Sequence, residues 1–169
     1  KSADAVIVPG GFGSRGIEGK IAAARYAREK KVPYLGLCLG AQLLAIEYAR
    51  YALRDETLTS EEFDESQKLA REKYVVHFLP GQSAGREKGG TLRLGAYECE
   101  LTPGTKAAAA YGQKTISERH RHRYEFNAAF RAPLEKAGLE LAPGDPVKKM
   151  PRDFADQAGG PLDPALKRT

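Results

Sequence analysis

Residues 33–42 read PYLGLCLGAQ and place Cys38 where an apolar run gives way to a helical pattern. The run at residues 32–37 has the composition of a short buried strand, and apolar residues recur at helical spacing over residues 39–53. The motif Gly36-Leu37-Cys38-Leu39-Gly40 therefore lies at a strand-to-helix junction. In a nucleophile elbow the central residue occupies a strained turn, so its neighbours must be small. The helix N-terminus behind the cysteine favours a thiolate, and an adjacent backbone N–H can supply half of an oxyanion hole.

The same motif has a simpler interpretation, a structural cysteine buried beside packing glycines. Five positions alone do not separate the two interpretations. The position between a predicted strand and a predicted helix favours the nucleophile, because that junction is where an elbow exposes its side chain. We therefore predict that Cys38 is a nucleophile.

The residues before this motif follow the same order of strand and helix. Residues 4–8 (DAVIV) predict a buried strand, and residues 16–31 predict a helix with one apolar face. The positions of that face are Ile17, Ile21, Ala24 and Ala27. Strands and helices that alternate at this spacing predict parallel strands joined by right-handed crossovers. We therefore predict an α/β fold, an open and mostly parallel sheet flanked by helices with a nucleophile elbow.

The second half of the chain changes character. Residues 54–73 are charged and weakly periodic, which predicts a surface excursion, and residues 74–79 (YVVHFL) predict a strand. A glycine-rich loop is expected at residues 82–90. The remaining predicted elements are strands at residues 91–94 and 97–101 and a short helix at residues 127–138 that ends at a glycine.

After Ala142 the sequence is interrupted by prolines and has few apolar residues. We therefore expect a domain at residues 1–142, followed at residues 143–169 by a proline-rich tail that is irregular or incomplete.

Composition limits the classes of function. The chain has 169 residues, enough for one domain with a core, and 27 Lys and Arg against 22 Asp and Glu give a mild net charge of +5. No apolar run approaches the roughly 20 residues that cross a bilayer, and the first residues lack the layout of a signal peptide, so we expect a cytoplasmic protein without membrane contact. Cys38 and Cys99 form no zinc-spaced cluster, so no metal site is expected, and Cys99 is predicted to pack.

Residues 9–16 (PGGFGSRG) form a glycine-rich turn after the first predicted strand. Gly11, Gly13 and Gly16 match the G-x-G-x-x-G of dinucleotide-binding folds, but that fingerprint requires an acidic residue near the end of the second strand, where this chain has Leu37. A second interpretation is that the loop, at the same sheet edge as the cysteine, supplies the other oxyanion N–H. A purely structural turn is the third.

Residues 118–125 (ERHRHRYE) alternate so that Arg119, Arg121 and Arg123 are expected on one face. Such a face can contact phosphates, yet acidic residues close both ends and no second basic patch accompanies it, so nucleic acid is not expected as a partner. The alternative is a strand edge protected by charge. His77, inside YVVHFL, is expected to be structural.

Five segments, in this order, resemble the class I glutamine amidotransferases and, within them, the glutaminase domain of CTP synthases. They are VPGGFGSRGIEGK (8–20), PYLGLCLGAQ (33–42), SEEF (60–63), GGTLRLGAYEC (89–99) and ERHRHRYEFN (118–127). The resemblance covers residues 4 to about 141. It implies a glutaminase that hydrolyses L-glutamine to glutamate and ammonia, for the ATP-dependent amination of UTP to CTP in pyrimidine nucleotide biosynthesis.

The resemblance also assigns roles to residues. Cys38 matches the nucleophile that forms a glutamyl thioester, and Gly11 matches the oxyanion contact. The glutamine-binding stretch corresponds to Leu39, Gly40, Ala41 and Gln42, with Ala41 departing from the family's usual methionine. Glu62 and Arg123 match the residues that hold the α-amino and α-carboxylate groups of glutamine, and their opposite charges suit a zwitterion. The rest of the basic octet is expected near the synthetase interface.

One departure stands out. The family has a later His-Pro-Glu, whose histidine is the acid/base group and whose glutamate orients it, and this sequence has no histidine after His122. We therefore expect a truncated or incomplete chain, or a degenerate homologue that binds glutamine or acts as a regulatory or structural module. The resemblance further implies no cofactor in this domain, ATP and Mg²⁺ in a synthetase domain of the same polypeptide, and a homotetramer.

Overall fold

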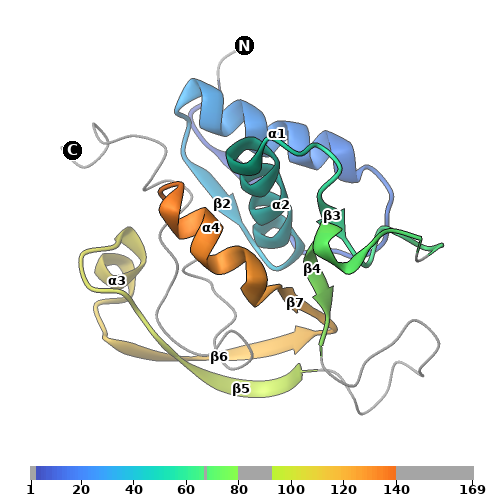
Figure 1. Cartoon of the computed structure of the whole chain (residues 1–169). Coiled ribbons are helices and arrows are strands. Elements are labelled where there is room, and N and C mark those ends of the chain that lie inside the picture. Colours follow the sequence, from blue (N-terminus) through green and yellow to red (C-terminus); the bar gives the residue numbers. More distant parts are fainter. Residues whose placement is uncertain (1–2, 67, 80–92, 140–169) are drawn as a thin grey trace.

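The computed structural model describes residues 3–66, 68–79 and 93–139. At its centre lies helix α2 (Leu39–Leu53), against which helix α1 (Ile17–Lys30) packs (Figure 1). The four positions expected on the apolar face of α1 are its buried residues, and α2 has the bounds that the sequence predicts. Every residue of α2 from Leu39 to Arg50 is buried, so this helix is the core element around which the others assemble.

Strand β1 (Val6–Val8) pairs in parallel with β2 (Tyr34–Gly36), and α1 connects them. This β-α-β unit confirms the predicted crossover and the α/β class. Because β2 runs directly into α2, the carboxyl ends of both strands meet at the start of that helix. Ligands of open α/β sheets bind at this edge.

The charged excursion contains a strand that the sequence pattern did not indicate. Strand β3 (Thr59–Ser60) pairs in parallel with β4 (Tyr74–Phe78), and β7 (Tyr124–Phe126) pairs antiparallel on the other side of β4. A short 3-10 helix, η1 (Arg71–Lys73), precedes β4. Two residues of strand are too few to show any periodicity, and tertiary pairing with β4 alone defines β3.

The remaining elements form a hairpin and a helical end. Strand β5 (Arg93–Glu100) pairs antiparallel with β6 (Thr115–His122), and the two lie below the rest of the molecule in the view of Figure 1. Helix α3 (Lys106–Tyr111) lies between them in sequence. Two strands were expected, at residues 91–94 and 97–101, but residues 93–100 form the single continuous strand β5. The predicted C-terminal helix is the 3-10 turn η2 (Ala128–Phe130) followed by α4 (Arg131–Lys136).

The described residues form two hydrophobic cores. The larger is built around α2, and the smaller consists of Cys99, Leu101 and Ile116 in the hairpin region. Burial of Cys99 confirms its predicted packing role. Within the larger core the carboxylate of Glu47, on α2 and fully buried, accepts hydrogen bonds of 3.0 and 2.8 Å from Nε and Nη2 of Arg28 on α1.

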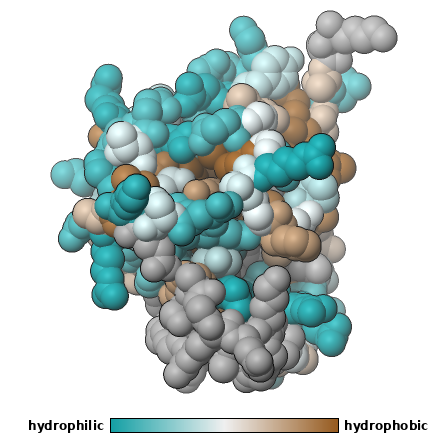
Figure 2. Space-filling model, turned by 90° about the vertical axis from the view of Figure 1, so that its right-hand side faces the viewer, coloured by the Kyte–Doolittle hydropathy of each residue, from teal (hydrophilic) through white to brown (hydrophobic). Residues whose placement is uncertain are grey.

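The face of the molecule drawn in Figure 2 carries mainly hydrophilic residues, with hydrophobic residues gathered in a smaller area near its centre. Among the described helices, none combines the length and apolar character needed to span a bilayer. The predicted glycine-rich loop at residues 82–90 and the predicted tail at residues 143–169 lie outside the described residues.

Candidate active site

Cys38 lies at the turn between β2 and α2 with a strained backbone. Its φ of 52° and ψ of −107° fall in a region that side-chain-bearing residues rarely adopt. The chain turns sharply, since the N–H of Gly40 donates to the Leu37 carbonyl at 2.9 Å and helical bonding begins with the Cys38 carbonyl, which accepts from Gln42 at 3.2 Å. Cys38 is exposed as a residue, although the surrounding turn partly desolvates its thiol. This is the geometry of the predicted elbow, with the side chain presented at the sheet edge.

The two glycines that flank the cysteine allow β1, β2 and α2 to approach closely. A Cβ at Gly40 would overlap the backbone carbonyl of Val8 on β1, and a Cβ at Gly36 would lie 2.5 Å from the carbonyl carbon of Gly40. The hydroxyl of Tyr34 also donates to the Gly40 carbonyl at 3.0 Å. The turn is therefore held by packing that only glycine permits at these two positions.

The glycine-rich loop at residues 9–16 comes close to the cysteine. A Cβ at Gly10 would lie 3.3 Å from Cβ of Cys38. The backbone N–H groups of Leu39 and Gly11 lie near the Cys38 thiol, and each lowers its pKa. Two N–H groups, one from the start of α2 and one from the loop after β1, thus lie on the side of the sulfur, an arrangement that can bind an oxyanion formed at an atom attached to it.

The surroundings of the thiol shift its pKa in opposing directions. Burial raises the pKa of Cys38, and the negative charge of Glu62 raises it further, while the Leu39 and Gly11 N–H groups offset only part of this effect. The net direction is upward from the ordinary value of a cysteine. This direction is opposite to the one expected from the helix N-terminus, because desolvation outweighs the donors at the start of α2.

Glu62 follows β3 and faces the same site. Its Oε1 accepts a hydrogen bond of 2.7 Å from the backbone N–H of Gly13. Burial raises the pKa of the Glu62 carboxyl, and the Gly13 N–H and the charge of Arg123 act in the opposite direction. The acidic residue, the basic residue and the thiol are thus electrostatically coupled, although they are far apart in the sequence.

Arg123 lies between β6, which ends at His122, and β7, which begins at Tyr124. The expectation of three arginines on one face was therefore wrong in part: Arg119 and Arg121 are exposed residues of β6, whereas Arg123 belongs to the bend that follows it. Its neighbour Tyr124 packs on Phe78, with ring centroids 4.6 Å apart, and burial raises the pKa of Tyr124 to about 12. The bend places a cation near enough to Glu62 to lower the pKa of its carboxyl.

The first turn of α2 contains the stretch expected to bind glutamine. Leu39, Gly40, Ala41 and Gln42 are all buried. Within these four residues, the backbone N–H of Leu39 lies near the Cys38 thiol and lowers its pKa. The first turn therefore lines the site mainly with backbone.

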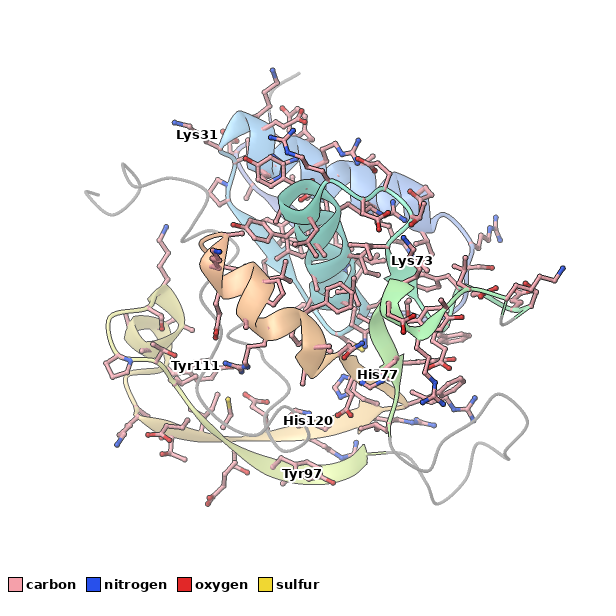
Figure 3. The ribbon with its side chains drawn as sticks, viewed as in Figure 1. Lys31, Lys73, His77, Tyr97, Tyr111 and His120 are labelled. Carbon is pink, nitrogen blue, oxygen red and sulfur yellow. The ribbon has the colours of Figure 1, made fainter. Side chains whose placement is uncertain are left out.

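The three histidines occupy other places. His77 is on β4, 3.9 Å from the buried carboxylate of Glu125, and burial lowers its pKa. His120 packs edge-on against Tyr97 and against His122 in the hairpin, with ring centroids 5.3 Å apart in both cases (Figure 3). In the described part of the chain, no histidine is among the groups that shift the Cys38 pKa. Residues 3–66, 68–79 and 93–139 also contain no cluster of side chains able to hold a metal ion.

The chain is similar to known proteins of one family. The family model described as glutamine amidotransferase class-I matches residues 1–144. The CTP synthase of Herpetosiphon aurantiacus is 53% identical over 141 residues, which are 83% of this chain and 26% of that protein. The CTP synthase of Fibrobacter succinogenes is 52% identical over 152 residues, 89% of this chain and 26% of that protein.

A solved structure resembles the fold as a whole. It is the glutaminase domain of Trypanosoma brucei CTPS with bound acivicin, which is 36% identical and superposes with a TM-score of 0.73 over 88% of this chain and 55% of that one. The chain spans about a quarter of the length of the curated relatives that it matches. With a family model that matches most of its residues, the chain belongs to the class I glutamine amidotransferase family.

Proposed function

We propose that this chain is the glutaminase part of a CTP synthase. It hydrolyses L-glutamine to glutamate and ammonia, and a synthetase domain of the same polypeptide uses the ammonia, with ATP and Mg²⁺, to convert UTP to CTP. Membership of the amidotransferase family and the names of the relatives support the reaction class. The observation that carries the proposal is the strained Cys38, whose thiol lies near two backbone N–H groups, one from the start of α2 and one from the loop after β1.

The binding roles follow from charge. The Glu62 carboxylate suits the α-ammonium group of glutamine, and the Arg123 guanidinium suits its α-carboxylate. This pair of charges, Glu62 and Arg123, is called the zwitterion grip below. It orients the amino acid so that its side-chain amide extends toward the sulfur. The buried first turn of α2, Leu39 to Gln42, forms the adjacent wall.

The reaction has two steps, acylation of the thiol and hydrolysis of the thioester, and each step forms one bond and breaks one. The Cys38 sulfur attacks the side-chain amide carbon, and the Gly11 and Leu39 N–H groups stabilise the resulting oxyanion. Collapse breaks the carbon–nitrogen bond and releases ammonia, whose additional proton comes from the thiol through an acid/base group. The γ-glutamyl thioester then reacts with water to give glutamate and the free thiol. Because the resting pKa of Cys38 is raised, proton removal from the thiol is part of the barrier.

The test is Cys38→Ala in the intact polypeptide. We expect CTP formation from glutamine to be lost and CTP formation from added ammonium salts to be retained, because only the first depends on the thiol. Unchanged glutamine-dependent synthesis would contradict the role of Cys38. Loss of both activities would point instead to a structural effect of the substitution.

The alternative expected from the sequence, a glutamine-binding module, stays a prediction. Among the described residues, no histidine shifts the pKa of Cys38. A glutamine-binding module without turnover, in a regulatory or structural role, would need the zwitterion grip and the thiol pocket but no imidazole. Binding of glutamine without release of ammonia would favour this module over the glutaminase. The cytoplasmic location and the homotetramer remain predictions.

A further inference from the structure

The loop that carries Gly11 is tied to the segment after β3 by two carboxylates. Glu62 accepts the Gly13 N–H at 2.7 Å in a partly buried position, and Glu65 accepts the Ser14 hydroxyl at 3.3 Å in an exposed one. Gly13 has a φ of 80°, a conformation natural only to glycine, so this stretch has much backbone freedom to lose. A short bond to the backbone two residues from Gly11 restricts that freedom where an oxyanion donor is needed.

The carboxylate that makes this bond is itself well anchored. The Glu62 N–H donates to the Ser60 hydroxyl at 3.2 Å, and Ser60 is buried in β3. The neighbouring Glu61 is bonded to β4 at two points, from its N–H to the Val76 carbonyl at 2.9 Å and from the Phe78 N–H to its carboxylate at 2.8 Å. Glu62 therefore projects from a segment that is fixed to the sheet.

A carboxylate can accept several hydrogen bonds at once. The bond from Gly13 occupies Oε1 of Glu62 and leaves acceptor capacity for an ammonium group. One side chain can thus hold the loop and the amino acid together.

We propose that Glu62 is a positioning residue for the oxyanion hole: by holding the Gly13 N–H it fixes the Gly11 N–H near Cys38, so that the glutamine grip and the oxyanion hole are assembled by one carboxylate. This inference rests on the proposed function. It goes further because it assigns Glu62 a role in the acylation step that does not depend on contact with the substrate ammonium group.

The decisive probe is an acyl donor without an α-amino group. p-Nitrophenyl acetate acylates a thiol through a tetrahedral oxyanion, but it has no ammonium group for Glu62 to bind. We would measure acylation of Cys38 in the full chain, with Cys38→Ala as the blank. The alkylation rate with iodoacetamide corrects for thiol ionisation and for folding, because that displacement forms no oxyanion.

Three substitutions of Glu62 separate the two roles. Glu62→Gln keeps an acceptor for the Gly13 N–H, whereas Glu62→Ala and Glu62→Met remove it, and Met preserves much of the side-chain bulk. We expect the corrected acylation rate to fall at least tenfold in the Ala and Met variants, since loss of one oxyanion donor costs about 10²–10³ in rate. In Glu62→Gln it should stay within about threefold of wild type, although glutamine binding is weakened in all three.

The matched control is Glu65→Ala, which removes the other carboxylate contact to the same loop. Because that contact is exposed and goes to a side chain, we expect the acylation rate to change less than twofold. Hydrogen exchange of the Gly13 amide should accelerate in Glu62→Ala and Glu62→Met but not in Glu65→Ala.

Corrected acylation rates in Glu62→Ala and Glu62→Met that equal the wild-type rate would overturn the inference, as would a wild-type chain whose Cys38 is not acylated. A different result would contradict the proposed function alone. In that case the chain does not bind glutamine, but its acylation by the ester still requires a hydrogen-bond acceptor at residue 62.

Discussion

At the scale of single residues, the backbone strain at Cys38 should lower the stability of the fold. A φ of 52° with ψ of −107° costs a residue with a Cβ about 1–3 kcal/mol. We predict that Cys38→Gly raises the free energy of unfolding by about 1 kcal/mol, because glycine adopts this conformation freely. Urea denaturation would measure the change. Cys38→Ala keeps the Cβ and should give little or no gain, and equal gains in both variants would show that the turn is not strained.

The pKa of the thiol leads to a second prediction at this scale. Since burial and Glu62 raise the pKa of Cys38, the thiolate fraction is low near neutral pH and grows only at a more alkaline pH than for an ordinary cysteine. The alkylation rate of the unliganded protein with iodoacetamide should therefore reach half its maximum at a higher pH in the folded chain than in urea. Glu62→Gln should move the folded midpoint toward lower pH. A folded midpoint below the unfolded one would contradict this electrostatic description.

The sequence predicted part of the site for local reasons. The G-x-C-x-G motif indicated Cys38, and the loop after the first strand was one candidate for the second oxyanion N–H, because the two share a sheet edge; Gly11 itself was named only by the family resemblance. Glu62 and Arg123 had no such local signal and came only from family resemblance. The direction of the Cys38 pKa depends on burial, which a five-residue motif does not encode.

At the scale of elements, the junction of β1, β2 and α2 depends on glycine. Gly40→Ala would drive a Cβ into the Val8 carbonyl, so we predict a loss of at least about 2 kcal/mol in the free energy of unfolding and loss of thiol reactivity toward glutamine analogues. The matched control is Gly19→Ala on α1, where an added Cβ meets no atom within 4 Å. That substitution should stabilise the protein by about 0.5–1 kcal/mol through helix propensity. Chemical denaturation of the two variants should give shifts of opposite sign, and a stable, reactive Gly40→Ala variant would refute the close packing.

The elements themselves were predicted to different degrees. Helices α1 and α2 followed from apolar positions at helical spacing, and α2 needed no tertiary information for its bounds. Strand β3 has two residues and exists only through its pairing with β4, so no periodicity could reveal it. The placement of Arg123 outside β6 reflects where the hairpin ends, which strict alternation does not predict.

At the scale of the whole molecule, the two cores differ greatly in size. The hairpin β5–β6 is supported by Cys99, Leu101 and Ile116, whereas α2 is buried along most of its length. We predict that the amides of β5 and β6 exchange hydrogen through local opening at a lower free energy than those of α2, because less apolar surface holds the hairpin. Native-state hydrogen exchange with increasing denaturant would measure both. Ile116→Ala should accelerate exchange in the hairpin and leave α2 nearly unchanged, while equal opening free energies for both elements would refute the separation.

The most direct test of the glutamine site at Cys38 is the intact mass of the protein after treatment with a chloroketone analogue of glutamine, with and without excess glutamine. We predict one adduct, mapped to Cys38 and not to the buried Cys99, and its formation should be suppressed by glutamine. We also predict that Arg123→Ala slows the adduct by at least tenfold, because the α-carboxylate loses its cation. No adduct on the folded protein, or an adduct that glutamine does not block, would contradict the claim that this elbow is a glutamine site.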